Sequence, residues 1–209
     1  MTYEIRPVEN MEELRRAWHF LYQVYSEEGW LPNDPDGIYR PPTSMGEHAL
    51  TMITLKSGHI CGTTTITCDQ KDVLLPLEAD FSDTLRLLRV HYGPIAEGGL
   101  MATEGRMFVP LLDMFRWFTY FAFYKDMGMI ITGTHPKNLK MYKRAFGMGS
   151  FGPLKDRSSV GQPCRVVGVT TESLIKGYRK NRAAKYFLDN PIPLNTFDDV
   201  WHPGPDEAV

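Results

Sequence analysis

The sequence has no apolar run that approaches the roughly 18 residues of a membrane-spanning helix. Its first six residues include a glutamate and an arginine, and they lack the apolar core of a secretory signal peptide. These two absences predict a cytoplasmic protein with no integral membrane association.

Cysteine is also scarce. Cys61, Cys68 and Cys164 are an odd number of widely spaced thiols, and no histidine lies near them in the spacing of a zinc site. We therefore expect no bound metal, and we predict that all three cysteines are buried and reduced.

An excess of charge of one sign is missing too. Lys and Arg number 23 against 25 Asp and Glu, so the formal net charge is −2 and gives no general reason to expect a nucleic-acid partner. The 209 residues are 43% apolar, which suffices for a real core in one domain, with or without an appended element.

The apolar periodicity predicts alternating strands and helices. A strand over residues 3–6 precedes a helix that begins after Asn10 and ends at Gly29. Residues 49–67 form a hairpin in which Gly62 marks a bulge or a close backbone contact. Loops are expected over residues 30–45 and 92–99. The later predicted elements are a helix that begins near residues 80–82, a strand over 129–134, a helix over 136–147, a strand over 165–170, a basic helix through 176–185 and a proline-rich tail from 189.

Residues 104–109, with the sequence EGRMFV, stand at the centre of this pattern. They are typical of a long strand that changes from polar to apolar. An aromatic helix over residues 111–127 follows and is expected to be buried on more than one side. The order of the elements predicts one α/β or α+β domain around a mixed sheet.

Several short motifs occur along this chain: VYSEEGWL at 24–31, Gly62-Thr63, LPLE at 75–78, EGRMFV at 104–109, HPKNLKMYKRAFGM at 135–148 and GQPC at 161–164. With the order of elements, they resemble the GNAT acyltransferase superfamily, and more closely its N-acyl amino acid synthase (FeeM-like) branch, a relative of the acyl-homoserine lactone synthases. The resemblance covers about residues 3–172. We therefore expect an acyltransferase domain over residues 1–172, and a basic helix and tail over 173–209 that pack on it or extend from it.

The resemblance implies a mixed, mostly antiparallel sheet flanked by helices, and an N-acyltransferase without a bound cofactor. The implied reaction moves a long-chain fatty acyl group from acyl carrier protein to the amine of an amino acid or similar small molecule, by direct attack. Many GNATs hold the CoA pyrophosphate in a glycine-rich loop before a helix. Residues 109–115 contain no glycine, and Asp113 adds a negative charge. This departure favours acyl carrier protein over CoA as the donor, and the basic helix is a candidate docking site for that acidic protein.

Acyl transfer to an amine needs a base, a polarised thioester carbonyl and an acid for the leaving thiol. We expect Glu104 to act as the base or to orient the amine, because burial at the start of an apolar strand raises a carboxyl pKa. A plain ion pair with Arg106 is the alternative, and Arg106 is itself a candidate for binding a substrate carboxylate. The resemblance implies oxyanion-binding backbone amides at Met107 and Phe108, and an acid at Tyr142, which is otherwise a core tyrosine.

Two binding regions are also predicted. The resemblance implies a donor region that holds the acyl chain and pantetheine, and its candidates are Met107, Phe108, Val109 and Phe115. The aromatic helix that carries Phe115 is otherwise ordinary core. The acceptor region has as candidates Glu28 and Trp30, which otherwise end a helix at the surface, and His135, which is either a proton shuttle or a turn cap.

Two further functions remain open at this point. One is a small-molecule GNAT acetyltransferase that uses acetyl-CoA. The other, from a different class, is a catalytically silent domain that binds acyl chains or a carrier protein.

Overall fold

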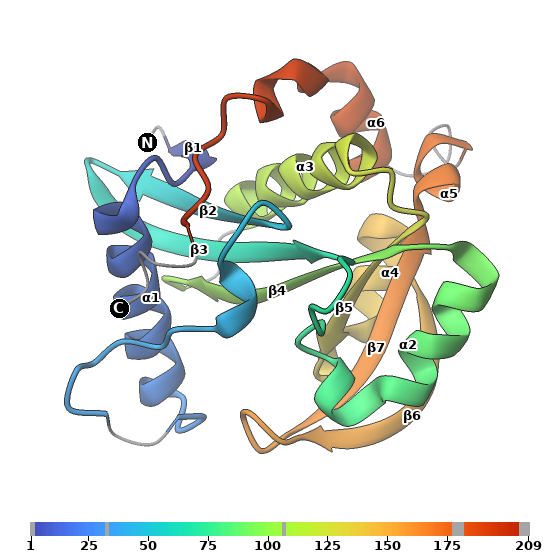
Figure 1. Ribbon diagram of the computed structural model, residues 1–209, viewed down its shortest axis with the longest axis horizontal. Coiled ribbons are helices and arrows are strands. Elements are labelled where there is room, and N and C mark those ends of the chain that lie inside the picture. The colour runs from blue at the N-terminus through green and yellow to red at the C-terminus, as the bar shows by residue number, and fades with distance from the viewer. Residues whose placement is uncertain (1–2, 32–33, 106–107, 177–181, 205–209) are drawn as a thin grey trace.

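The computed structural model describes residues 3–31, 34–105, 108–176 and 182–204 (Figure 1). The strands are β1 (Glu4–Pro7), β2 (Ala49–Lys56), β3 (His59–Cys68), β4 (Ile95–Thr103), β5 (Met129–Thr134), β6 (Gly149–Arg157) and β7 (Gln162–Thr170). The α-helices are α1 (Met11–Glu27), α2 (Glu78–Tyr92), α3 (Phe108–Tyr124), α4 (Leu139–Phe146), α5 (Thr171–Lys176) and α6 (Arg182–Asp189). Short 3-10 turns are η1 (Pro42–Ser44), η2 (Pro136–Asn138) and η4 (Leu194–Phe197).

The described strands form one mixed sheet in the order β1-β2-β3-β4-β5-β7-β6. Every neighbouring pair is antiparallel except β4 and β5, which are parallel. Helices cover both faces (Figure 1). The predicted fold class, a mostly antiparallel mixed sheet flanked by helices, is confirmed.

The two faces of the sheet carry different cores. On one face, Ala96 of β4 and Ile130 of β5 pack with aromatic residues of α3 and α4, including Phe118 and Phe146. On the other face, residues of β4, β5 and β7 pack with α2, and residues of β2 pack with α1. The alternation of side chains along each strand therefore builds a three-layered domain.

The parallel pair β4–β5 is short. Only Ile95, Ala96 and Glu97 of β4 have partners on β5, although β4 continues to Thr103 and β5 to Thr134. The two strands therefore separate after Glu97. No ladder hydrogen bonds join their later residues, and this opening lies near the middle of the sheet.

A β-bulge interrupts β4 at the same place. Thr63 pairs with Ala102 and Thr65 pairs with Gly99, so the two residues Leu100 and Met101 stand opposite the single residue Thr64. Leu100 has a φ of 50°, a left-handed conformation that a branched side chain adopts at a cost. A bulge leaves a residue of the ladder unpaired and turns the strand.

The position of the central strand was predicted wrongly. Residues 95–103 form β4, where a loop was expected over 92–99, and residues 108–109 begin α3, where a strand was expected over 104–109. The pair Gly98-Gly99 explains the error, because glycine is depleted in strands and marks loops. Here Gly98 is required in the strand, since a Cβ at this position would lie 3.0 Å from the ring of Phe118.

Other predicted elements are confirmed. The Asn10 side chain caps α1 by accepting a hydrogen bond from the backbone N–H of Glu13, at 2.9 Å. The β2–β3 register shifts opposite Gly62, as its place in the strand predicted. All three cysteines are buried and free. Edge strand β6, which is exposed along most of its length, was not predicted.

The C-terminal segment packs on the domain. Two helices, α5 and α6, occupy the region of the predicted basic helix, and residues 177–181, which include Arg179 and Lys180, lie outside the described residues. Phe197 is 2% exposed and its ring lies 5.5 Å from the rings of Phe121 and Tyr124 on α3. The tail therefore covers the outer side of α3 (Figure 1).

We predict that Phe197→Ala destabilises the whole domain. Removal of a buried phenylalanine costs about 3–5 kcal/mol of unfolding free energy, which lowers the Tm of a chain of this size by roughly 10 °C. Leu194→Ala is the matched control, because Leu194 lies in the same turn and is 46% exposed. Thermal denaturation measures both variants. Equal effects of the two substitutions would show that the tail is not part of the cooperative domain.

Candidate functional site

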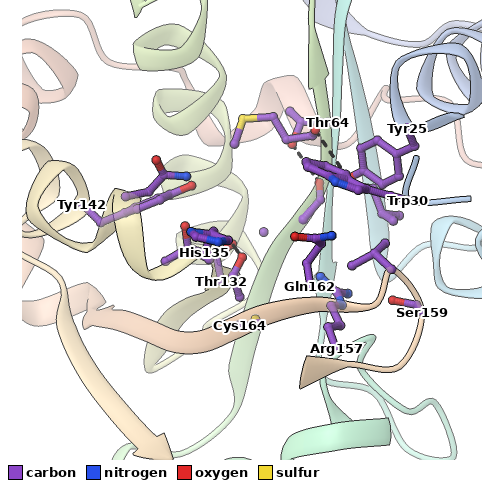
Figure 2. Close-up of a pocket in the computed structure, with 18 of the residues that line it drawn as sticks. Tyr25, Trp30, Thr64, Thr132, His135, Tyr142, Arg157, Ser159, Gln162 and Cys164 are labelled. Atoms are coloured by element: carbon purple, nitrogen blue, oxygen red, sulfur yellow. Dashed lines mark hydrogen bonds between the residues drawn. The ribbon is translucent and has the colours of Figure 1, made fainter. Parts of the chain in front are cut away.

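A cavity of about 450 Å³ occupies the opening between β4 and β5 (Figure 2). Residues 98–101 of β4 form one wall and residues 132–134 of β5 form the other. The divergence of β4 and β5, the one parallel pair among the described strands, therefore produces the cavity. Pockets at such a break in strand order are the usual ligand sites of open sheets.

The two ends of the cavity differ in chemistry. One end is apolar and is formed by α3 and α4, through Met114, Phe115, Phe118 and Tyr142. The other end is formed by α1, the loop after it and the β6–β7 hairpin, through Tyr25, Trp30, Tyr39, Arg157, Ser159 and Gln162. Figure 2 shows Tyr142 on the opposite side of the cavity from Tyr25 and Trp30. The cavity thus joins an apolar end to a polar, aromatic end.

Side chains hold the bulge of β4 in place. The Thr64 hydroxyl donates to the carbonyl of Gly99 at 2.9 Å, and the Tyr25 hydroxyl donates to the carbonyl of Met101 at 3.4 Å. Burial raises the pKa of Tyr25 to about 12, so its hydroxyl keeps its proton at neutral pH. The strained backbone at Leu100 is therefore fixed at the wall of the cavity, as is common at functional sites.

Glu97 lies where β4 and β5 separate, and it was not predicted as a site residue. Its side chain is 1% exposed, and it lies beside Gly99 and Arg157, which line the cavity. One carboxylate oxygen, Oε2, accepts the backbone N–H of Leu77 at 2.9 Å. The other, Oε1, has no hydrogen-bond partner within the described residues. The sequence signal for Glu97 is a carboxylate inside an apolar run. The two glycines that follow it favour a loop, so the sequence does not predict its burial.

The pKa of the Glu97 carboxyl group lies near neutral pH. Burial raises the pKa of this carboxyl to about 7, against the opposing effects of the Arg157 charge and the Leu77 N–H. A carboxyl group with this pKa exchanges protons at physiological pH, which is the property of a general base or acid.

Tyr142 faces the cavity from α4 and is also part of the core. It is 3% exposed, and its ring lies 5.9 Å from the ring of Phe115. Burial raises the pKa of Tyr142 to about 12, and a hydrogen bond with Thr134 opposes this shift. The hydroxyl is therefore protonated at neutral pH and available as a donor. Tyr142 is therefore a core side chain that also lines the cavity, and its role as the acid stays a prediction.

Four other predicted residues also line the cavity: Phe115, Glu28, Trp30 and His135. Phe115 stacks on Phe146 at 4.2 Å and closes the apolar end. Trp30 packs edge-on against Tyr25 at 5.2 Å, and Glu28 is exposed. The His135 ring accepts the backbone N–H of Lys137 at 3.2 Å, which is the capping interaction weighed as its alternative role.

The burial expected for Glu104 is wrong. Glu104 is exposed in the turn after β4, where its backbone N–H donates to the carbonyl of Cys61 at 2.9 Å, and it does not line the cavity. Arg106 and Met107 lie outside the described residues. Phe108 and Val109 belong to the start of α3. Phe108, expected to supply an oxyanion-binding amide from a strand, lies in α3, and the bulge that the structure describes in the central strand is at Leu100.

The expected position of Asp113 is also corrected. The connection between β4 and α3 is residues 104–107, so Asp113 lies inside α3. Its carboxylate accepts hydrogen bonds from Arg116 at 2.7 Å and from the Tyr186 hydroxyl at 3.1 Å. Asp113 is therefore neutralised at a helix contact. The connection itself has the sequence EGRM, with one glycine, so it is not the glycine-rich loop of CoA-binding GNATs.

Two absences hold for the residues that the structure describes. They contain no cluster of three or more His, Cys, Asp or Glu side chains able to bind a metal ion. None of their helices is long and apolar enough to cross a membrane.

The family model of the N-acyl amino acid synthase FeeM matches residues 16–170, which are most of the chain. The chain belongs to the FeeM family. No curated protein matches the sequence. FeeM-family membership makes this protein an N-acyltransferase, and it confirms the resemblance on which the prediction rested.

Solved structures agree with this assignment at the level of the fold. FeeM, an N-acyl amino acid synthase from uncultured soil microbes, has 16% identity and a TM-score of 0.73, over 88% of this chain and 98% of that one. The CoA-dependent acyl-homoserine lactone synthase BjaI, with SAM and isopentyl-CoA, has 12% identity and a TM-score of 0.63, over 90% and 89%. A GNAT acetyltransferase from Streptococcus pneumoniae has 16% identity and a TM-score of 0.53, over 81% and 99%.

Glu97 makes the stability of this FeeM-family protein depend on pH. Because its pKa of about 7 lies above the ordinary value of 4.5, the folded state binds more protons than the unfolded state between these values. The unfolding free energy therefore falls as the pH rises through this window. Glu97→Gln removes the titration, and above pH ~7 the variant should be the more stable protein by on the order of 3 kcal/mol.

Urea denaturation of both proteins between pH 4.5 and 8.5 tests this expectation. The difference between them should be small at the acidic limit and should grow through neutrality. Parallel stability curves would show that Glu97 titrates normally in the folded protein.

Proposed function

We propose that this protein transfers a fatty acyl group from a carrier thioester to the amine of an amino acid or a similar small amine. The observation that carries this proposal is the buried Glu97 carboxylate, whose Oε1 has no hydrogen-bond partner among the described residues, on a bulged strand that lines a two-ended cavity. The apolar end suits the acyl chain, because Met114, Phe115 and Phe118 supply adaptable apolar walls. The polar end suits the amine.

The chemistry follows from this placement. Glu97 takes a proton from the acceptor ammonium, and the free amine nitrogen attacks the thioester carbonyl carbon. Backbone N–H groups at the Leu100 bulge stabilise the oxyanion of the tetrahedral intermediate. The C–S bond then breaks, Tyr142 gives its hydroxyl proton to the leaving thiolate, and the nitrogen loses its second proton to solvent as the amide forms. Tyr142 regains a proton from solvent, and Glu97 releases the one it took.

Direct attack is favoured over an acyl-enzyme. Cys164 is the one cysteine of the cavity lining, and burial raises the pKa of its thiol. It therefore stays protonated and is a poor nucleophile. The amine and the thioester must then be bound at the same time, at the two ends of the cavity.

We predict that Glu97→Gln lowers kcat/KM by roughly 100- to 1,000-fold, the usual contribution of a general base. In the wild type, kcat/KM should fall below pH ~7, as Glu97 becomes protonated. Glu104→Gln is the matched control, because Glu104 is exposed and outside the cavity. Thiol release from an acyl donor in the presence of amino acids measures both. A large loss at Glu104 with none at Glu97 would return the role of base to Glu104.

The product class is tested by mass spectrometry of small molecules extracted from expressing cells. Long-chain N-acyl amino acids should appear with the wild type and should be absent with Glu97→Gln. Extracts that contain only acetylated amines would overturn the proposal in favour of an acetyl-CoA-dependent enzyme. A lack of any turnover would favour a silent binding domain.

We propose acyl carrier protein as the donor. The sequence from 127 to 155 contains no Asp or Glu. Within it, Lys140, Lys143 and Arg144 are exposed on α4, and none of them forms an ion pair among the described residues. Lys137, just before α4, is exposed and lines the cavity. A basic helix beside the apolar end suits an acidic carrier protein that delivers its acyl chain there.

Reversal of charge on α4 should weaken a protein donor selectively. With Lys140→Glu and Arg144→Glu combined, we expect kcat/KM with acyl carrier protein to fall roughly tenfold or more at low salt, and less at high salt. Acyl-pantetheine, which lacks the protein, should react as with the wild type. The control variant combines Lys71→Glu and Arg86→Glu, two exposed positions away from the cavity. Better turnover of acyl-CoA than of the carrier-bound donor by the wild type would contradict this assignment.

A further inference from the structure

Arg157 is a partly buried cation that has no hydrogen bond among the described residues. It is the last residue of β6, opposite Gln162 on β7, and both side chains lie at the cavity (Figure 2). Its side chain is 16% exposed. Its Nε is buried and has no partner within the described residues, and no described hydrogen bond uses its other nitrogens.

Arg157 forms a long ion pair with Glu97, but no hydrogen bond joins the two groups. The distance from Arg157 Nη2 to Glu97 Oε1 is 3.8 Å, which is beyond hydrogen-bond length, and Oε1 has no other partner. Buried charges with unfilled hydrogen-bonding positions are costly unless a ligand or water completes them. A cation and an anion, both incompletely bonded, therefore converge at the side of the cavity.

We infer that Arg157 binds the carboxylate of the acceptor, and that it thereby selects α-amino acids over simple amines. This inference rests on the proposed role of Glu97. An α-amino acid carries an ammonium and a carboxylate on the same carbon atom. With its ammonium at Glu97 Oε1 and its carboxylate at the Arg157 guanidinium, it matches the two protein charges with opposite signs. A planar guanidinium is the side chain best suited to bind a carboxylate through two parallel hydrogen bonds.

The rest of this end supports a carboxylate at Arg157. Gln162 and Ser159 supply neutral polar groups beside it, and Lys137, another cation of the lining, belongs to the opposite wall with η2. The aromatic rings of Tyr25, Trp30 and Tyr39 lie at the same end and leave room for an amino-acid side chain. The head group of the acceptor is thus fixed by charge and its side chain by apolar contact.

The test compares acceptors that differ only in the carboxylate: phenylalanine, phenylalaninamide and 2-phenylethylamine, and leucine with its matched amide and amine. Rates are measured at about pH 9, well above the pKa of about 7 of Glu97 in the wild type. The wild type should prefer each amino acid. Arg157→Gln should raise the KM for the amino acids by roughly 10- to 100-fold, which is the loss of affinity expected when a charged hydrogen bond is removed. The same substitution should change kcat/KM for the amines less than threefold.

Two further variants separate binding from structure. Arg157→Lys keeps the charge but loses the planar pair of donors, so its KM for the amino acids should be intermediate. Arg165→Gln is the matched control, because Arg165 lies on β7, bonds the carbonyl of Gly152 at 2.9 Å and does not line the cavity. It should keep the wild-type preference. Thermal denaturation confirms that each variant is folded.

The outcomes distinguish this inference from the proposed function. Wild-type protein that acylates amines and amides as well as it does amino acids, or an Arg157→Gln variant that keeps the wild-type preference, overturns the inference and leaves the acyltransferase intact. Wild-type protein that acylates none of the six acceptors overturns both. An equal loss on all acceptors in Arg157→Gln would show that Arg157 acts only through Glu97, and would also overturn the inference.

Discussion

The site depends on one constraint, which is that β4 and β5 pair in parallel over only three residues. Parallel strands that stay together bury their backbone groups in a continuous ladder. Here the ladder stops at Glu97, and the strands diverge into a cavity that passes from the α3 side of the sheet to the α1 side. The bulge at Leu100 turns β4 further away from β5 and keeps the opening from closing.

The chemistry of the site is a consequence of this break in the sheet. Glu97 is the last residue of β4 that pairs with β5, and its buried carboxyl group lies beside Gly99 and Arg157, which line the cavity. Burial raises its pKa to about 7, and the neighbouring arginine limits the rise. The carboxyl group of Glu104, which follows the end of β4, is exposed to solvent and lacks this environment.

Regular elements could be predicted from the sequence, and the irregular ones could not. The α1 helix, the β2–β3 hairpin and α4 follow from helical or alternating periodicity and from caps such as Asn10 and Gly147.

The sequence does not predict β4, because its two glycines serve contacts that local sequence does not show, namely the ring of Phe118 and the space beside Glu97. β6 was missed because it is an edge strand with Gly152 and Pro153, exposed on both faces. Five of the ten predicted site residues line the cavity: Glu28, Trp30, Phe115, His135 and Tyr142. All except Phe115, which lies on the aromatic helix, come from the family motifs. The base and the carboxylate-binding arginine, as proposed above, sit on the two strands that the periodicity did not show.

The two-ended cavity has a consequence for how a product leaves. In the proposed reaction, an acyl chain held by α3 and an amino acid held beside the β6–β7 hairpin would become one amphiphile once the amide bond forms, and that molecule would span the sheet. It cannot leave by both ends. Either its charged head group passes through the opening between β4 and β5 towards the apolar end, or its tail is drawn the other way, past Gly99 and the aromatic rings. Longer chains make the second route slower, so the shape that allows two substrates to meet also makes release a step that depends on chain length.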